Sequence, residues 1–271
     1  MKKKLISLAL AGALSLSLIV PSFAAQTYVP SWLEQGVLLE DAAGFSAPFT
    51  PVSKGGKWGY VNQLGGLAIA PQYEYALAFS DGLAAVSRDG KCGYIDASGK
   101  AVIALQYEDA ASFSEGLAAV GQNGKFGFID KSGKTVIALQ YEAASSFSNG
   151  LALVTQNGKC GYVDKTGKTV VAPQYDGGYN FTTDGLALIR KDGRWGYVDR
   201  AGKEAIALQY DQALVFSEGL AAVSKGGKWG FIDKTGKEVV PIAYDAVSAF
   251  SEGLAKVSKN GKWGYIDQTG K

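Results

Sequence analysis

The stretch Gly227-Lys228-Trp229-Gly230-Phe231-Ile232-Asp233-Lys234-Thr235-Gly236-Lys237 decides the fold, because its pattern recurs along the whole chain. The element Gly-Lys/Arg-X-Gly-Tyr/Phe-Ile/Val-Asp/Asn occurs seven times, at spacings of 34, 34, 34, 35, 34 and 34 residues. Such a fixed period is typical of a repeat protein, in which each unit packs on its neighbours. Residues 39–45 fit the same columns, so the array is predicted to run over residues 37–271. The residues at X are Trp58, Cys92, Phe126, Cys160, Trp195, Trp229 and Trp263.

Each unit is predicted to consist of short β-strands joined by tight turns. Every copy has Asn-Gly, Asp-Gly or Gly-Gly before the Lys/Arg of the motif, as in Asn123-Gly124. These are the residues of type I′ hairpin turns, because both central positions need a positive φ. The strands, such as 117–120 and 135–139, are apolar on both faces, so neighbouring units should cover each sheet on both sides. The sequence therefore predicts an all-β array of seven small antiparallel sheets.

The recurring motif resembles the WG (or KWG) repeat of bacterial proteins. Its flanks, Phe-Ser-Glu-Gly-Leu-Ala and Gln-Tyr-Asp/Glu, belong to the same pattern, and the resemblance covers about residues 37–271. The chain departs from the name motif where Cys92, Phe126 and Cys160 replace tryptophan. The resemblance implies a bacterial repeat protein and supplies no catalytic residue or cofactor.

Two architectures fit this resemblance. The hairpin looks like the inner hairpin of β-propeller blades, and seven is a common number of blades. A β-propeller-like fold is therefore expected, with residues 36–39 completing the last sheet to close or nearly close a ring. The alternative is an open β-solenoid of hairpins, because the same hairpin also resembles that of choline-binding cell-wall repeats.

The N-terminal region has the features of a secretory signal peptide. Three lysines at positions 2–4 precede an apolar stretch over 5–20, and Ser22-Phe23-Ala24 ends the segment. Residues 1–24 are predicted to be removed after Ala24, and residues 25–36 are interpreted as a leader. The apolar stretch is shorter than the ~20 residues that span a bilayer. The protein is therefore expected to be secreted or associated with the cell envelope, without a membrane span in the mature chain.

Charge and composition narrow the functions further. Removing three of the 27 basic residues leaves 24 against 25 acidic residues, so the formal charge changes from +2 to −1. Nothing in that balance favours nucleic acid. The chain has no histidine, which excludes Ser-His-Asp and Cys-His catalysis. No cofactor and no metal site are predicted.

The acidic residues of the Phe-Ser-Glu-Gly turns are periodic, and no copy stands out as an active site should. We therefore expect a non-catalytic binding or scaffold protein, whose partner is an unidentified protein or a cell-wall glycan. The alternative is a glycan-directed hydrolase or lyase that uses pairs of these carboxylates. The turn acids are Asp81, Glu115, Asp184, Glu218 and Glu252.

The tryptophans of the motif are weak candidates for ligand binding. An exposed indole stacks on a sugar ring or a peptide, whereas cysteine and phenylalanine in the same column favour a buried core position. The four candidates are Trp58, Trp195, Trp229 and Trp263.

Two further columns receive structural interpretations. The aspartates that end the motif are interpreted as turn caps rather than a ring of cation ligands, because Asn62 replaces the first of them. Cys92 and Cys160 lie two units apart in one column, beyond the ~7 Å between Cα atoms that a disulfide allows. They are predicted to be buried free thiols. The aspartates are Asp96, Asp130, Asp164, Asp199, Asp233 and Asp267.

Overall fold

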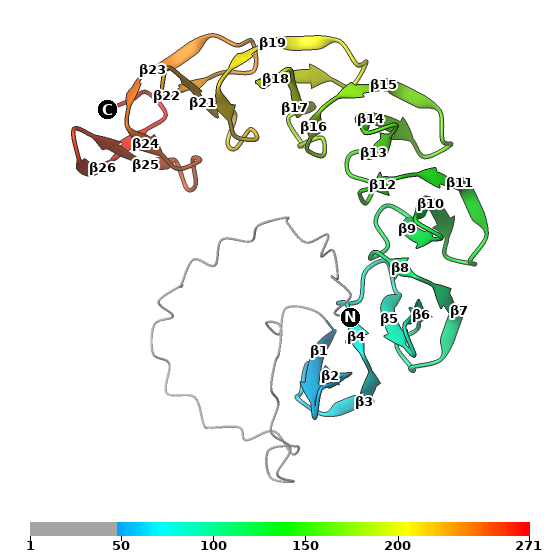
Figure 1. The fold of residues 1–271 in the computed structure, drawn as a ribbon. Coiled ribbons are helices and arrows are strands. Elements are labelled where there is room, and N and C mark those ends of the chain that lie inside the picture. Colours follow the sequence, from blue (N-terminus) through cyan, green and yellow to red (C-terminus); the bar gives the residue numbers. More distant parts are fainter. Residues whose placement is uncertain (1–47) are drawn as a thin grey trace, which may run out of the picture.

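A computed structural model describes residues 48–271, which form seven small antiparallel sheets and, within that range, no helix. The sheets follow one another along an open arc in the order of the sequence (Figure 1). The first sheet consists of β1 (Phe49–Lys54), β2 (Lys57–Asn62) and β3 (Leu67–Tyr73). The second and third are β4 (Tyr75–Ala76), β5 (Ala84–Arg88), β6 (Lys91–Ile95) and β7 (Ala101–Tyr107), then β8 (Asp109–Ala110), β9 (Leu117–Gln122), β10 (Lys125–Asp130) and β11 (Thr135–Tyr141).

The remaining four sheets repeat this layout. The fourth and fifth are β12 (Ala143–Ala144), β13 (Leu151–Gln156), β14 (Lys159–Asp164) and β15 (Thr169–Tyr175), then β16 (Gly177–Gly178), β17 (Leu186–Lys191), β18 (Arg194–Asp199) and β19 (Glu204–Tyr210). The last two are β20 (Gln212–Ala213), β21 (Ala221–Lys225), β22 (Lys228–Ile232) and β23 (Glu238–Tyr244), then β24 (Ala246–Val247), β25 (Leu254–Lys259) and β26 (Lys262–Asp267).

Each four-stranded sheet is a meander in which consecutive strands pair. In β8-β9-β10-β11, the two-residue strand β8 lies on the inner side of the arc and the longer β11 on the outer side (Figure 1). Glu108 alone separates β7 of one sheet from β8 of the next. One extended segment therefore serves two sheets, and this couples neighbouring units through the backbone.

Both tight turns of the unit use the left-handed region of backbone conformation. The φ values are 53° at Asn123 and 70° at Gly124, as a type I′ hairpin requires. The Phe-Ser-Glu-Gly turn is built alike, with φ of 56° at Glu115 and 87° at Gly116. Its ends are joined by reciprocal backbone hydrogen bonds of 2.9 and 3.2 Å between Ser114 and Leu117. The prediction for the first turn is confirmed.

The glycine of the Trp-Gly pair makes room for a bulge in the outer strand. Between the pairs Phe126↔Tyr141 and Phe128↔Ile137, β11 advances four residues while β10 advances two. A Cβ atom on Gly127 would lie 2.5 Å from the carbonyl oxygen of Ile137, which is closer than any real contact. The five equivalents place the same atom 2.3–2.7 Å from backbone: Gly59, Gly93, Gly161, Gly196 and Gly230.

The core lies between sheets rather than within them. Tyr94 and Ile103 of one sheet pack with Val120 and Ile129 of the next in a single cluster. Tyr94 also meets Phe113, with ring centroids 4.7 Å apart, in one of six such pairs at 4.7–5.0 Å along the array. The expectation that neighbours cover both faces is therefore confirmed for the sheets inside the array, whereas the last sheet leaves Tyr265 68% exposed.

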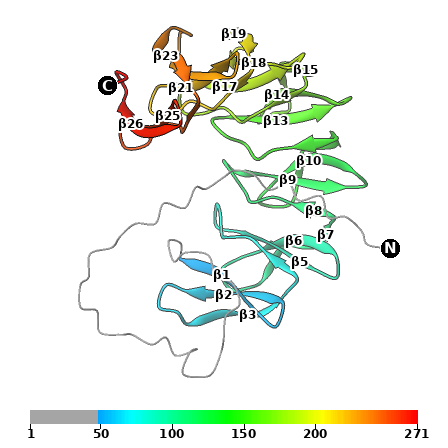
Figure 2. The ribbon, with the colours of Figure 1, turned by 60° about the vertical axis from the view of Figure 1, so that its left-hand side comes forward.

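The predicted array of seven small antiparallel sheets is confirmed, but the expected closure is not seen among residues 48–271. The first sheet, β1-β2-β3, and the last, β24-β25-β26, lie well apart in both views of the molecule (Figures 1 and 2). Residues 36–39, expected to close the ring, lie outside the described residues, as do the signal peptide and the leader. Among residues 48–271, there is no helix of the length and apolarity that crossing a membrane requires.

Candidate functional site

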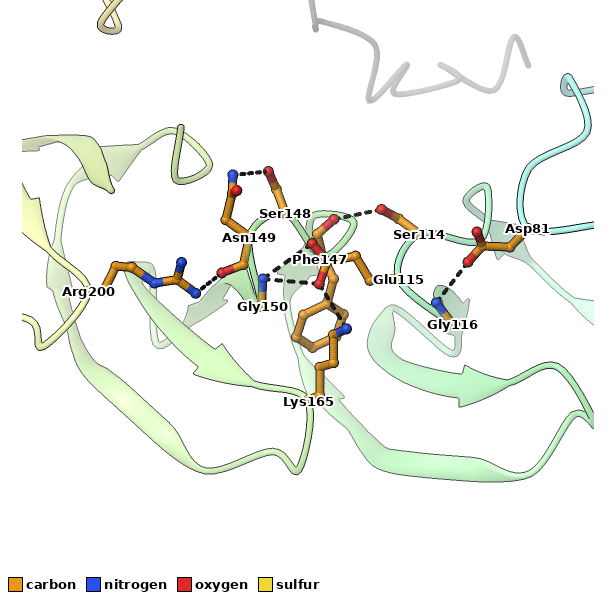
Figure 3. Close-up of polar contacts among 10 residues, drawn as sticks. All are labelled: Asp81, Ser114, Glu115, Gly116, Phe147, Ser148, Asn149, Gly150, Lys165 and Arg200. Carbon is orange, nitrogen blue, oxygen red and sulfur yellow. Dashed lines mark hydrogen bonds and ion pairs between the residues drawn. The ribbon is translucent and has the colours of Figure 1, made fainter. Parts of the chain in front are cut away.

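The Phe-Ser-Glu-Gly turns bind one another from unit to unit and form a series that we call the turn ladder, comprising residues 79–82, 113–116, 147–150, 181–185, 216–219 and 250–253. The Ser114 hydroxyl donates a hydrogen bond of 2.8 Å to the carbonyl of Phe147 in the next turn (Figure 3). Glu115 accepts a hydrogen bond of 3.0 Å from the backbone N–H of Gly150 and forms an ion pair of 2.9 Å with Lys165 (Figure 3). Such hydrogen bonds join consecutive turns along the array, and within residues 48–271 the step from 181–185 to 216–219 is the exception.

The side chains of the turn acids therefore connect neighbouring units through hydrogen bonds. Asp81 accepts a hydrogen bond of 2.8 Å from the N–H of Gly116, and Glu218 accepts one of 2.9 Å from that of Gly253. Partial burial favours the neutral form of Glu115, but the hydrogen bonds from Lys165 and the backbone outweigh it and lower the pKa of Glu115. The hydrolase alternative would need these same turn carboxylates as its general acids and bases, and in the structure they bind backbone N–H groups and lysine.

A second acidic column joins units at the Asn-Gly turns. Asp176, which follows the Gln-Tyr pair, accepts a hydrogen bond of 2.5 Å from Lys159 in its own unit. It also accepts one of 2.8 Å from the backbone N–H of Asp192 in the next unit. The hydrogen bond from Lys159 lowers the pKa of Asp176. Glu142 likewise accepts a hydrogen bond of 3.0 Å from the backbone N–H of Asn157.

The aspartates that end the motif cap their own turns, as predicted. Oδ1 of Asp130 accepts hydrogen bonds from the backbone N–H of Ser132 and of Lys134, at 2.9 and 3.0 Å, and from the Ser132 hydroxyl at 2.6 Å. Asn62 does the same with its amide oxygen toward Leu64 and Gly66. Within residues 48–271, no group of three or more histidine, cysteine or acidic residues is placed to hold a metal ion.

This cap predicts a specific pH dependence. The hydrogen bond from Ser132 lowers the pKa of Asp130 below its unfolded value of about 3.9. A lowered folded pKa adds stability that is present above the unfolded pKa and lost as the pH falls through the folded pKa. Asp130→Asn keeps the accepting oxygen but has no charge to lose. We expect the difference in melting temperature between wild type and Asp130→Asn to shrink between about pH 5 and pH 3. A constant difference over that range would contradict the charge-based account.

The candidate tryptophans lie at the margin of the core. Trp58, Trp195 and Trp229 are half-buried and pack against the inter-sheet clusters, whereas Trp263 is 58% exposed. The first three are therefore neither fully buried, as the core interpretation expects, nor fully exposed. Their role in ligand binding stays a prediction.

The two cysteines are unpaired, as predicted, but they are half-buried rather than buried. Cys92 and Cys160 pack against separate clusters, and the sheet β8-β9-β10-β11 lies between their own sheets. Burial raises the pKa of the Cys92 thiol and makes its reactive thiolate scarcer.

We expect two thiols per chain when the protein is denatured without reductant. The native protein should react more slowly at Cys92 than an exposed thiol, because the raised pKa lowers the thiolate fraction. Titration with a chromogenic disulfide reagent measures both quantities. A count of zero thiols after denaturation would show that the two cysteines form a bridge.

One sheet, β16-β17-β18-β19, departs from the repeat in several ways that the acidic columns do not reveal. It contains the only one-residue insertion between motifs, in the turn 181–185 between β16 and β17, and it carries three of the four arginines of the chain. Its Arg190 lies over the ring of Trp195, 5.9 Å from the centroid. Tyr179 contacts the same indole, with centroids 6.1 Å apart. The sequence signal for this group is Arg190 itself, one large residue in a column that otherwise holds serine, glycine or threonine.

The repeat itself matches a known family. The family model for the WG containing repeat matches six consecutive segments: 58–92, 93–126, 126–160, 161–195, 195–229 and 229–263. This chain belongs to the WG repeat family. The matches run from one motif to the next and agree with the period of the structure.

Solved structures similar to this WG repeat protein resemble it in fold. A eukaryotic initiation factor has 11% identity and a TM-score of 0.53, over 82% of this chain and 70% of its own. BamB from Moraxella catarrhalis has 14% identity and a TM-score of 0.46, over 81% and 79%. Hsv2p from Kluyveromyces lactis has 10% and 0.48, over 81% and 88%; BamB and Hsv2 are β-propellers. At these identities the likeness carries no ligand across. No curated protein matches the chain.

Proposed function

We propose that this WG repeat protein is an exported, non-catalytic binding or scaffold module. The observation that carries the proposal is that the periodic acidic side chains form hydrogen bonds and ion pairs that hold the repeat units together. The turn ladder, the acids after Gln-Tyr and the aspartate caps all hold backbone N–H groups or lysines in place, as Glu115, Asp176 and Asp130 illustrate. Their regular engagement supports a rigid support surface rather than a reaction centre.

Export is supported by the sequence of residues 1–24, with its lysines, apolar stretch and small residues before the cleavage point. Expression of the full chain in a bacterium tests it directly. The protein recovered outside the cytoplasm should have the mass of residues 25–271. Recovery of only the uncleaved chain in the cytoplasm would overturn the proposal of export.

The binding role is tested with the mature protein immobilised at known density. Solubilised cell-wall glycan and individual envelope proteins are passed over it, and a saturable, concentration-dependent signal is expected for one of them. The same material incubated with the protein should release no new reducing ends. Release of reducing ends would favour the hydrolase or lyase, and a complete lack of saturable binding would count against the binding module.

A further inference from the structure

Arg190 is a single large cation in a column of small residues. It occupies the position two residues before the Asp/Asn/Gly-Gly turn on the second strand of the sheet, and it pairs across the strands with Trp195. Every other copy has a side chain no larger than threonine there: Ser53, Ser87, Gly121, Thr155, Ser224 and Ser258.

The residue on the other side of Arg190 is reduced to glycine. Gly177 of β16 pairs with Arg190, and a Cβ atom on Gly177 would meet nothing within 4 Å. Its equivalents carry side chains in the other described sheets that have this inner strand: Tyr75, Asp109, Ala143, Gln212 and Ala246. The space that these side chains occupy elsewhere is therefore open beside Arg190, on the inner side of the arc where β16 lies (Figure 1).

Aromatic rings border this open space. Tyr179, immediately after β16, is 49% exposed, and its ring is inclined by 38° to that of Trp195. The backbone of Tyr179 is held firmly, because its N–H donates to Leu188 at 2.9 Å and its carbonyl accepts from the Tyr162 hydroxyl at 2.6 Å. The exposed ring thus projects from a fixed support.

The charge of Arg190 is available, unlike that of its neighbours. Arg194 forms an ion pair with Asp211, and Arg200 donates to the carbonyl of Asn149. The guanidinium of Arg190 forms no ion pair or hydrogen bond within residues 48–271; it lies over the indole of Trp195, and its charge also contributes to the lowered pKa of Asp176. The nearby carboxylate of Asp176 is already engaged by Lys159 and a backbone N–H.

We propose that Arg190, Tyr179 and Trp195 form a binding site for an acidic saccharide, a pyranose ring that bears a carboxylate. This inference rests on the binding function proposed above and names its site and ligand class. A guanidinium presents its donors in a planar fork that matches a carboxylate. The ring of Tyr179, 49% exposed, suits the flat C–H face of a sugar ring, and Trp195 contacts both Tyr179 and the Arg190 guanidinium. An anchoring peptide side chain needs an enclosing pocket instead, and the space beside Gly177 is open.

Two variants test the site, one by removing the charge and the other by filling the open space. Each installs the residue that the next sheet has at the equivalent position. Arg190→Ser installs the residue found at Ser224 and removes the guanidinium. Gly177→Gln installs the residue found at Gln212 and fills the open space without touching Arg190. Because both residues occur at equivalent positions, each variant should melt close to wild type, which melting curves check first.

Binding is measured by calorimetry in about 150 mM salt with a trimer of galacturonic acid and with the neutral trimer of galactose. We expect wild type to bind the acidic trimer, and each variant to bind it at least about tenfold more weakly, as the loss of a charged hydrogen bond predicts. The control is Arg88→Gln, which removes an equal charge from another sheet and installs the residue of Gln122 and Gln156. Its affinity should stay within about twofold of wild type.

Several results would overturn the site. No binding of the acidic trimer by wild type would do so, as would equal binding of the neutral trimer or an equal loss in Arg88→Gln. Tighter binding of a glutamate-rich peptide that also depends on Arg190 would reassign the site to a protein ligand. An envelope partner captured equally by wild type and by Arg190→Ser would refute this site and leave the binding function intact. Failure of wild type to capture any partner would count against the function itself.

Discussion

Gly127→Ala is expected to lower the free energy of unfolding by about 3 kcal/mol or more, although it adds a single methyl group. The new Cβ atom would lie 2.5 Å from the carbonyl oxygen of Ile137 and 2.7 Å from backbone atoms of Ala138. Backbone yields less readily than the end of a side chain, so the bulge of β11 must shift or its hydrogen bonds must break. Urea unfolding followed by circular dichroism measures the loss.

The last sheet supplies a matched control for this prediction. Gly264 occupies the same column, but in the described residues no outer strand equivalent to β11 pairs with β26, and a Cβ atom on Gly264 meets nothing within 4 Å. Gly264→Ala should therefore leave the free energy of unfolding within about 0.5 kcal/mol of wild type. Equal losses in the two variants would show that strand propensity, rather than the bulge, explains the glycine.

Phe231→Ala should cost about 3–5 kcal/mol, because the ring is fully buried between two sheets. It packs against Phe250 at 4.7 Å between centroids, and truncation leaves a cavity in the core between the sixth and seventh sheets. In a repeat array such a loss weakens one interface, so unfolding should also become less cooperative. Thermal unfolding followed at several wavelengths detects both effects.

Trp229→Ala, two residues earlier on the same strand, should cost clearly less, about 1–2 kcal/mol, since the indole is half-buried at the margin of that cluster. Tyr265→Ala is the control for Phe231→Ala, because Tyr265 holds the equivalent position and is 68% exposed. It should change stability by no more than about 0.5 kcal/mol. If Trp229→Ala proved as costly as Phe231→Ala, the tryptophan column would belong to the core after all.

The Asn-Gly turns and the aspartate caps could be predicted from the sequence, because each depends on interactions among a few neighbouring residues. The residue pair Asn123-Gly124 signals a turn with positive φ wherever it occurs, and the spacing from Asp130 to Lys134 suffices for the cap. The period placed every unit in register, and the two-sided apolar strands indicated that neighbouring sheets cover each other. The departure at Arg190 was equally present in the sequence, but only the fold places Trp195 and Tyr179 beside each other and Trp195 beside Arg190.

The sequence by itself determined the family, the number of units, the all-β class and the Asn-Gly turns, because the period and the turn residues depend on contacts within one unit. Only the tertiary structure showed that Gly127 makes room for the bulge of β11. It alone also showed that the carboxylate of Glu115 binds Gly150 and Lys165 in other units. It also decided that the described sheets follow an open arc. These features join residues 10–50 positions apart in different strands or units. Nothing in the spacing of one column states its distance to another, and small rotations between successive sheets, summed along the array, set whether the arc closes.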